Sequence, residues 1–353
     1  MVLAVIAERW VLRMAYKKHI FDSHNARKIH RGDVPRLGGI IFFPVSTIAV
    51  LLSSIVAMRL FNYTVLPGDL SEILGLIGAM FIMFMFGMFD DFRDVRYRAK
   101  FVSQIVAGLL LCVSGLWLKD LHGLFGIHAL SPWVGWPLTI FAIIFVINAV
   151  NFIDGIDGLA GTTCMFGLSY YAYFNYMTAN SLMFLLSITL IGCVLPYLYF
   201  NLFGTSKGHT KVFMGDTGST ILGVVMVSFG MMVNNSLPSD NAVNPMMLGF
   251  APLVYPCYDT VRVVLHRLRN HRNPFKADMN HFHHKLLAVG FSQRATLLII
   301  NCISISFIIL MTLSCLFIDV TLVLLLSLLL WMAINIVITR RMKTKNTIEN
   351  EEN

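Results

Sequence analysis

Apolar runs of about 20 residues recur along nearly the whole chain, which is the length that an α-helix needs to cross the hydrocarbon core of a bilayer. The runs are continuous rather than alternating, and each exceeds a membrane β-barrel strand in length, so helices are predicted and barrel strands are excluded. Only 13% of the 353 residues are charged, against about 25% in an average soluble domain. These features exclude a soluble globular enzyme, a secreted disulfide scaffold and a disordered chain, and they predict an all-α polytopic membrane protein.

About 11 transmembrane helices are expected, in one membrane domain over residues 1–340 that is followed by a cytoplasmic tail over 341–353. The first run, 1–16, is short and contains charged residues. A cleaved signal sequence is the alternative there, but no small-residue cleavage site follows, so we interpret the run as a first helix that lacks its outer half. The other helices are expected at 38–60, 72–89, 101–118, 136–153, 159–178, 181–202, 217–236, 245–265, 295–317 and 320–339.

Eleven crossings divide the connecting segments into two sets of very different charge. One set holds 22 of the 27 Lys and Arg residues and nine of the 11 histidines. Positive charge marks the cytoplasmic side of a membrane protein, so this set is predicted to face the cytoplasm and the amino terminus to face out. The net charge of +8 is therefore interpreted as a sign of orientation, and no nucleic acid is expected as a partner.

Two acidic motifs stand where predicted helices leave the membrane on this basic side. Asp90 and Asp91 are adjacent carboxylates, which repel each other unless a cation or a proton lies between them; the alternative is a solvated helix end balanced by nearby arginines. The second motif runs from Asn148 to Gly161, and it places Asn148, Asn151 and Asp154 on one helical face, with Asp157 after them. So many polar groups at membrane depth indicate a ligand site more strongly than helix capping does.

Three further segments lie on the same side. Phe213-Met-Gly-Asp-Thr-Gly-Ser219 precedes a helix, so its acidic residue Asp216 is either an N-cap or a metal ligand beside an anion site at the helix terminus. The segment from 266 to 294 carries Arg262 at its border and the cluster His281, His283 and His284; it suggests a cationic clamp on diphosphate. An early basic turn contains Lys28 and precedes the sequence Pro35-Arg-Leu-Gly-Gly39.

Taken in order, the Pro-Arg-Leu-Gly-Gly sequence, Asp90-Asp91, Asn148 to Gly161, the Asp216 motif and His281-x-His-His284 resemble the polyprenyl-phosphate N-acetylhexosamine-1-phosphate transferases of glycosyltransferase 4 type. The resemblance covers about residues 17 to 340. It is closest to the bacterial undecaprenyl-phosphate GlcNAc-1-phosphate transferases of O-antigen, enterobacterial-antigen and teichoic-acid synthesis, and weaker toward the phospho-MurNAc-pentapeptide translocase. The curtailed first helix is the one departure.

The resemblance implies a reaction in which UDP-GlcNAc and undecaprenyl phosphate give undecaprenyl-diphospho-GlcNAc and UMP, with Mg²⁺ or Mn²⁺, at the cytoplasmic face of the bacterial inner membrane. A homodimer is compatible with it. It implies Asp216 and Asn151 as metal ligands, catalytic roles for the carboxylates and histidines, and substrate binding by the remaining polar residues. The residues concerned are Asp90, Asp91, Asp216, His281, His283 and His284 for catalysis, and Asn148, Asp154, Asp157, Arg262, Lys100 and Lys28 for substrate binding.

The role of Asp90 has two versions, a positioning role in direct attack by the lipid phosphate or a covalent intermediate. A phosphomonoester with a second pKa of about 6 is mostly dianionic at neutral pH and needs little help from a base, which favours direct attack. Other functions remain as alternatives. A sister transferase would use another UDP-HexNAc (GalNAc, FucNAc or QuiNAc). A transporter would place its carboxylates near the midplane between repeats, which the sequence does not show. A membrane zinc hydrolase would rest on the three histidines alone.

Overall fold

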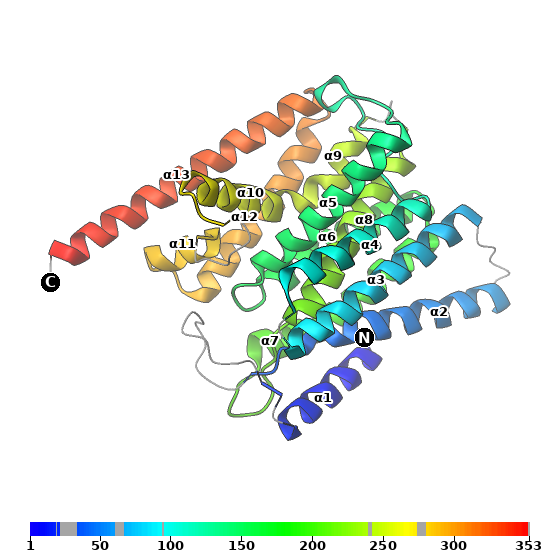
Figure 1. The fold of residues 1–353 in the computed structure, drawn as a ribbon, viewed down its shortest axis with the longest axis horizontal. Coiled ribbons are helices and arrows are strands. Elements are labelled where there is room, and N and C mark those ends of the chain that lie inside the picture. The colour runs from blue at the N-terminus through cyan, green and yellow to red at the C-terminus, as the bar shows by residue number, and fades with distance from the viewer. Residues whose placement is uncertain are drawn as a thin grey trace.

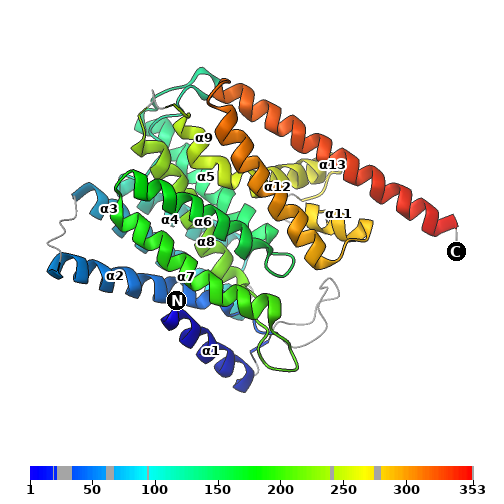
Figure 2. The same ribbon diagram turned by 180° about the vertical axis from the view of Figure 1, so that it is seen from behind.

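The computed structural model describes residues 1–18, 20–21, 34–60, 67–93, 95–238, 242–273 and 280–351. Within these ranges the chain is helical, apart from turns, loops and an isolated antiparallel bridge between Asp120 and Ala129, so the all-α prediction is confirmed for them. Figures 1 and 2 show the helices gathered into one bundle, with α1 and α13 at its periphery. The longer helices are α1 (Val2–Lys17), α2 (Phe42–Leu60), α3 (Pro67–Arg93), α4 (Tyr97–Val113), α5 (Pro132–Ile153), α6 (Leu159–Met177), α7 (Ser181–Phe203), α8 (Gly215–Ser236), α10 (Val254–Arg269), α12 (Gln293–Ser314) and α13 (Val320–Glu351).

Shorter helical pieces complete the described chain: η1 (Gly38–Ile41), η2 (Leu124–Gly126), α9 (Pro245–Phe250), η3 (Ala251–Leu253) and α11 (Phe282–Val289). Seven segments of the described residues are long and apolar enough to cross a membrane. This supports a multi-pass membrane protein and leaves the count of eleven crossings as a prediction. The seven are Gly38–Leu60, Leu70–Arg93, Pro132–Ile153, Ser181–Phe203, Gly215–Ser236, Gln293–Ser314 and Val320–Met342.

The segment expected as one helix over 245–265 is broken. It consists of α9, the short 3₁₀ turn η3 and α10. Pro252 lies within η3 and Pro256 lies in the first turn of α10, and a proline removes a backbone donor and clashes with the preceding turn of a helix. As a result α10 starts anew after η3, and it packs against α5 and α12.

Other boundaries differ by about a turn or more. The helix expected at 101–118 begins earlier, at Tyr97. It also ends earlier, at Val113, because Gly115 adopts a left-handed backbone with φ 99°. The last helix, expected to end at residue 339, continues from its apolar run to Glu351. Figure 2 shows this end of α13 projecting beyond the rest of the bundle.

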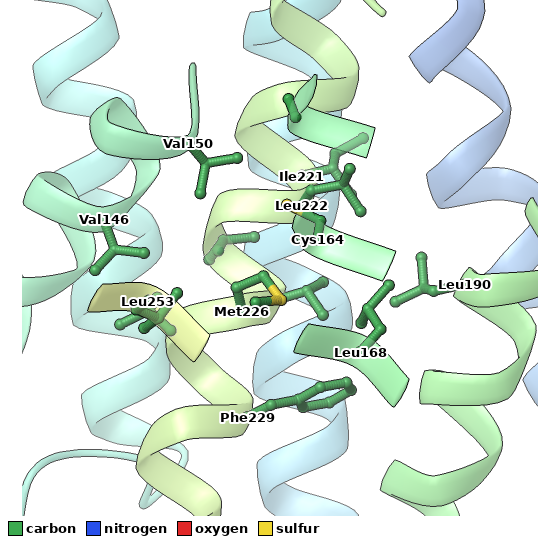
Figure 3. Packing of buried hydrophobic residues seen from close by; sticks show 14 of the residues in the cluster. Val146, Val150, Cys164, Leu168, Leu190, Ile221, Leu222, Met226, Phe229 and Leu253 are labelled. Atoms are coloured by element: carbon green, nitrogen blue, oxygen red, sulfur yellow. The ribbon is translucent and has the colours of Figure 1, made fainter. Parts of the chain in front are cut away.

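Helix α8 is the centre of the bundle. It packs against α3, α5, α6 and α9, and Ile221, Leu222 and Phe229 on it are fully buried. Figure 3 shows α8 side chains meeting those of α5, such as Val146, and those of α6, such as Leu168. Because α8 is buried on all sides, its N-terminal end is held in a fixed place by its neighbours, and the candidate site is built around that end.

Candidate active site

Two glycine motifs that are distant in the sequence are joined by backbone hydrogen bonds. The amide of Gly38 donates to the carbonyl of Phe213 over 3.0 Å, and the amide of Gly39 donates to that of Met214 over 2.9 Å. A Cβ atom on Gly39 would lie 2.1 Å from Cα of Gly218, so only glycine permits this approach. The contact fixes η1 against the N-terminal end of α8.

Asp91, near the C-terminal end of α3, caps α8. One of its carboxylate oxygens accepts a hydrogen bond from the amide of Asp216 over 2.7 Å. The other accepts from the amide of Thr217 over 2.9 Å and from its hydroxyl over 2.6 Å. The first amides of a helix lack partners within the helix, so this carboxylate satisfies two of them and complements the helix dipole. The helix terminus that was predicted as an anion site is thus filled by a side chain of the protein.

Lys100, near the start of α4, lies between two carboxylates. Its Nζ atom forms an ion pair with Oδ2 of Asp90 and a second one with Oδ2 of Asp216, the latter over 3.2 Å. The other oxygen of Asp90 accepts from the amide of Val95 over 2.7 Å, which fixes the direction of this carboxylate. Helices α3, α4 and α8 therefore bring one cation and two anions to a single point, and an anion pair of this kind is stable only with positive charge between its members.

Asn151, near the C-terminal end of α5, holds Asp216 from the other side. Its Nδ2 donates to Oδ1 of Asp216 over 2.5 Å and to Oγ of Ser219 over 2.8 Å. A carboxylate only accepts hydrogen bonds, so the amide nitrogen of Asn151 is the atom that faces Asp216. In this geometry Asn151 orients Asp216.

A cavity opens beside these residues. One wall contains Asn148, whose Nδ2 donates to Oε1 of Gln104 over 2.9 Å and to the carbonyl of Ile144 over 2.7 Å. The apolar part of the lining, Met83 and Phe86, comes from α3. The cavity thus combines charged, amide and apolar lining, and it is lined by Met83, Phe86, Gly87, Asp90, Lys100, Ser103, Gln104, Asn148, Asn151, Asp216 and Thr220.

Asp154 follows the last residue of α5 and is held close to several other carboxylates. Burial and the negative charges of Asp216, Asp91 and Asp157 raise the pKa of Asp154 to about 7, and the positive charge of Arg36 opposes this shift only in part. The ionised form of a carboxyl group in such surroundings is stabilised by any cation or hydrogen-bond donor that a ligand brings to it. The structure therefore keeps Asp154 in the candidate site.

Asp157 is occupied by a contact within the protein. Its Oδ2 accepts from Nζ of Lys211 over 2.6 Å, and the same Nζ donates to the carbonyl of Asn201 over 2.5 Å. The side chain of Asn201 in turn accepts from the amide of Gly158 over 2.6 Å and donates to the carbonyl of Val212 over 2.8 Å. This network ties the turn between α5 and α6 to the segment that leads into α8.

The predicted cationic clamp is organised around Asp259, which is fully buried in α10. Its Oδ1 accepts from Nε and Nη2 of Arg262 over 3.2 and 2.7 Å, and its Oδ2 accepts from Nδ1 of His281 over 2.9 Å. The amide of Phe282 also donates to this carboxylate, over 3.1 Å to Oδ1. Burial alone would raise the pKa of Asp259, but the hydrogen bond from the imidazole and the charge of the guanidinium outweigh it and hold the pKa at about 2.

His283 is buried, and among the described residues neither of its ring nitrogens has a hydrogen-bond partner. Burial, together with the neighbouring rings of His284 and His281, lowers the pKa of His283 to about 3, so this ring is neutral at physiological pH. A Cβ atom on Gly155 would lie 2.2 Å from Nε2 of His283, so the ring rests directly on the glycine backbone. A buried polar ring with no partner in the described part of the chain calls for an explanation, and a ligand in this place supplies one.

The end of α5 joins the two halves of the site. Asn151 reaches Asp216, while the ring of the next residue, Phe152, lies 5.7 Å from that of His281. Three residues further on, Gly155 touches His283. The carboxylates around Lys100 and the histidine cluster thus lie on either side of one short turn, although His281 follows Asp216 by 65 residues and Asp90 by 191 in the sequence.

Comparison with known proteins shows which sequences this chain resembles. Residues 73–234 match the model of glycosyl transferase family 4, and this range holds Asp90, Asp91, Asp216, Lys100 and Asn151. The chain is therefore similar to glycosyl transferase family 4 over this range. It is 28% identical over 296 residues, 82% of this chain and 75% of the relative, to the undecaprenyl-phosphate alpha-N-acetylglucosaminyl 1-phosphate transferase of Yersinia pestis. It is 29% identical over 303 residues, 84% and 78% of the two chains, to a Bacillus subtilis protein named probable undecaprenyl-phosphate N-acetylglucosaminyl 1-phosphate transferase.

Most of the predicted site residues come together, and they fall into two groups. Asp90, Asp216, Lys100 and Asn151 are in direct contact, with Asn148 in the wall of the adjoining cavity. Arg262, His281, His283 and His284 form the second group, in which the rings of His283 and His284 are 4.2 Å apart. Lys28 lies outside the described residues. In the described part of the chain, no three His, Cys, Asp or Glu side chains are grouped closely enough to hold a metal by themselves.

Sequence reasoning missed three residues that organise the site. Gln104 is one helical turn beyond Lys100 and shares its face of α4, a spacing that could have indicated it. Asp259 precedes Arg262 by three residues on α10, which is likewise a helical pairing distance. Lys211 gives no such signal, because its partner Asp157 is 54 residues away.

Proposed function

We propose that this protein transfers GlcNAc-1-phosphate from UDP-GlcNAc to undecaprenyl phosphate, giving undecaprenyl-diphospho-GlcNAc and UMP. An oxygen of the lipid phosphate attacks the β-phosphorus of the donor, and the bond between that phosphorus and the bridging oxygen breaks as UMP leaves. The names of the relatives support this reaction. The single observation that carries it is the convergence of Asp90, Lys100 and Asp216 in a cavity that also has apolar lining.

The mixed lining of the cavity suits a lipid phosphate. Met83 and Phe86 of α3 form part of the lining. Phe86 is 39% exposed, and other large apolar residues along α3 are exposed as well. A prenyl chain can follow such a surface from the bilayer, while its phosphate reaches Lys100. Amphiphilic acceptors require this combination of apolar contact area and a few precisely placed polar groups.

The chemistry expected at this point is mainly electrostatic. Two anionic phosphates must approach each other, so catalysis rests on positioning and on neutralising charge rather than on covalent chemistry. Lys100 provides a fixed positive charge, and Asp90 and Asp216 fix its position. Asp90 is held by both Lys100 and the amide of Val95, a geometry that favours a positioning role in direct attack over a covalent intermediate.

A divalent cation, Mg²⁺ or Mn²⁺, fits the carboxylates at this point. Mg²⁺ is commonly held by one or two carboxylates together with substrate phosphates rather than by a complete protein cage. Asp90 and Asp216 already converge on one cation, the Nζ of Lys100, and would hold the metal, with Asn151 keeping Asp216 in place. When bound, the metal neutralises and polarises the donor diphosphate.

The donor would lie across the turn after α5. The family resemblance implies that Asp154 and Asp157 hold its uridine end, and that Arg262 and the histidines face its diphosphate and sugar. Asp154 remains well placed for this, while Asp157 is engaged by Lys211. We propose further that the chain crosses the inner membrane of a bacterium eleven times with this site at the cytoplasmic face, since the cytoplasm holds UDP-sugars and the basic segments mark that side.

The test is UMP release by the purified protein in detergent, with undecaprenyl phosphate, Mg²⁺ and a panel of UDP-sugars. We expect release that requires both the lipid and the metal and is highest with UDP-GlcNAc. A D216N variant should abolish it, whereas D319N, which removes a carboxylate from the start of α13, is the matched control and should retain it. Preference for another UDP-HexNAc would assign a sister activity, and no release from folded protein with any donor would refute the proposal.

A further inference from the structure

We propose that Asp259 is a positioning residue that aims Nε2 of His281 and Nη1 of Arg262 at the UDP-sugar. The inference deepens the proposed function and rests on it. Asp259 is fully buried, and its two oxygens accept hydrogen bonds from three other residues, on α10, on α11 and just before α11. No motif or relative assigns it a role.

The contact with His281 decides which of its ring nitrogens faces outward. A carboxylate has no hydrogen to donate, so Nδ1 of His281 must carry the proton that bridges the 2.9 Å to Asp259. The described residues offer no partner to Nε2, and this nitrogen remains for a ligand. Carboxylates that hold an imidazole in this way commonly fix both its tautomer and its orientation.

The contact with Arg262 works in the same manner. Nε and Nη2 of the guanidinium are directed to Oδ1 of Asp259, and Nη2 also donates to the carbonyl of Asn280 over 2.5 Å. One side of the planar group is therefore used within the protein, and Nη1 is left on the other side without a partner among the described residues. A guanidinium oriented in this way presents a fixed donor to a phosphate oxygen.

The third contact fixes the helix on which the other histidines lie. The amide of Phe282, the first residue of α11, donates to Asp259, so one buried anion ties the start of α11 to α10. His281 lies beside Phe152, which follows Asn151 on α5. The atoms that Asp259 leaves available thus belong to side chains next to the turn that contains Asp154, where the proposed donor would lie. Hydrogen-bond donors and a cation here match a sugar diphosphate.

The decisive measurement is the tautomer of His281 in ¹⁵N-histidine-labelled protein in detergent, with H281Q used to assign the signal. The wild type should show the Nδ1–H tautomer. In D259N the side-chain amide can donate to the ring, so the Nε2–H tautomer should appear, while D259E should keep the wild-type form. A wild-type ring protonated on Nε2 alone would overturn the proposal without any variant.

Kinetics test the consequence for the reaction. In D259N, kcat/KM for UDP-GlcNAc should fall about 10- to 100-fold, as for other residues that orient a functional imidazole, with an unchanged KM for undecaprenyl phosphate. H281Q should add little to this loss, because both changes act through the same ring. The positioning role would be overturned if the losses of kcat/KM in D259N and H281Q were fully additive in the double variant. It would also be overturned if D259N lowered kcat/KM equally for UDP-GlcNAc and for undecaprenyl phosphate. If the wild type releases no UMP at all, the proposed function fails, and the tautomer measurement still reports on Asp259.

Discussion

The carboxylate of Asp91 accepts a hydrogen bond from the amide of Asp216 over 2.7 Å, so the adjacent acidic residues of α3 have separate tasks. Asp91 holds the end of α8, whereas Asp90 contacts Lys100. Neighbouring residues on a helix point about 100° apart, and this difference directs one carboxylate to the backbone of α8 and the other to the cavity. An acidic pair that looks like one site in the sequence is a cap and a site residue in the structure.

Substitution of the two residues should therefore have different effects. D91N removes the negative charge and one of the two oxygens that accept hydrogen bonds from the start of α8. It should therefore lower the free energy of unfolding by about 1 kcal/mol, as expected for a lost cap. It should also reduce UMP release, because Asp216 is displaced. D90N should abolish UMP release with a smaller change in thermal midpoint. Thermal unfolding in detergent and UMP release on the same samples measure both. Equal thermal midpoints for the two variants would contradict this division of roles.

The close contact between Gly155 and His283 gives a second prediction. In G155A the new methyl group would lie 2.2 Å from Nε2 of His283, so the ring must move, and both stability and UMP release should fall. In an H283A background the ring is gone, and G155A should then have little further effect on stability. A double-mutant cycle of thermal unfolding measures this coupling. Equal destabilisation by G155A in both backgrounds would show that the ring is not the obstacle.

Much of the fold could be predicted from the sequence, because apolar runs of membrane length report helices directly. The break after α9 could also have been predicted, since Pro252 and Pro256 are strong signals for the end of a helix. What the pattern could not give was which helix is central. Helix α8 is one of the less apolar spans and is nevertheless almost completely buried.

The composition of the site was predictable and its internal contacts were not. Asn151 was indicated because polar groups at membrane depth are costly and therefore informative, whereas Asp90 and Asp216 received their roles from the family resemblance. That Lys100 lies between Asp90 and Asp216 depends on how α3, α4 and α8 pack, over a separation of 116 residues between Lys100 and Asp216. Hydropathy and spacing within one helix carry no information about such contacts.

Gln104 offers a test of the cavity as the acceptor site. Its side chain is buried at the cavity wall and holds the amide of Asn148. Q104L removes this hydrogen bond and should raise KM for undecaprenyl phosphate by up to about tenfold, the effect of one lost hydrogen bond. Q104E retains an acceptor but adds negative charge and should weaken lipid binding further. Steady-state kinetics with each substrate varied separately provide the readout; an increase confined to the KM for UDP-GlcNAc would place the donor in this cavity instead.

The raised pKa of Asp154 predicts a pH dependence of stability. With a pKa of about 7 in the folded protein and about 3.9 in the unfolded chain, Asp154 binds a proton more tightly when the protein is folded. Its contribution to stability is greatest below about pH 4 and is lost as the pH rises to 7. D154N mimics the protonated form, so it should be more stable than the wild type at pH 8, with a difference that shrinks toward pH 4. Thermal midpoints of both proteins across this range measure it, and a constant difference would contradict the prediction.

The ion pair between Asp157 and Lys211 separates a structural role from substrate binding. K211M removes the charge that faces Asp157 and a donor to the carbonyl of Asn201, so it should destabilise the protein by about 3 kcal/mol, as expected when one partner of a largely buried pair is lost. The double variant D157N/K211M should recover part of this stability, since it leaves no uncompensated charge. If Asp157 acts mainly through Lys211, D157N lowers the thermal midpoint and leaves KM for UDP-GlcNAc near its wild-type value. A large increase in that KM with an unchanged midpoint would instead establish Asp157 as a contact of the uridine, as the family resemblance implies.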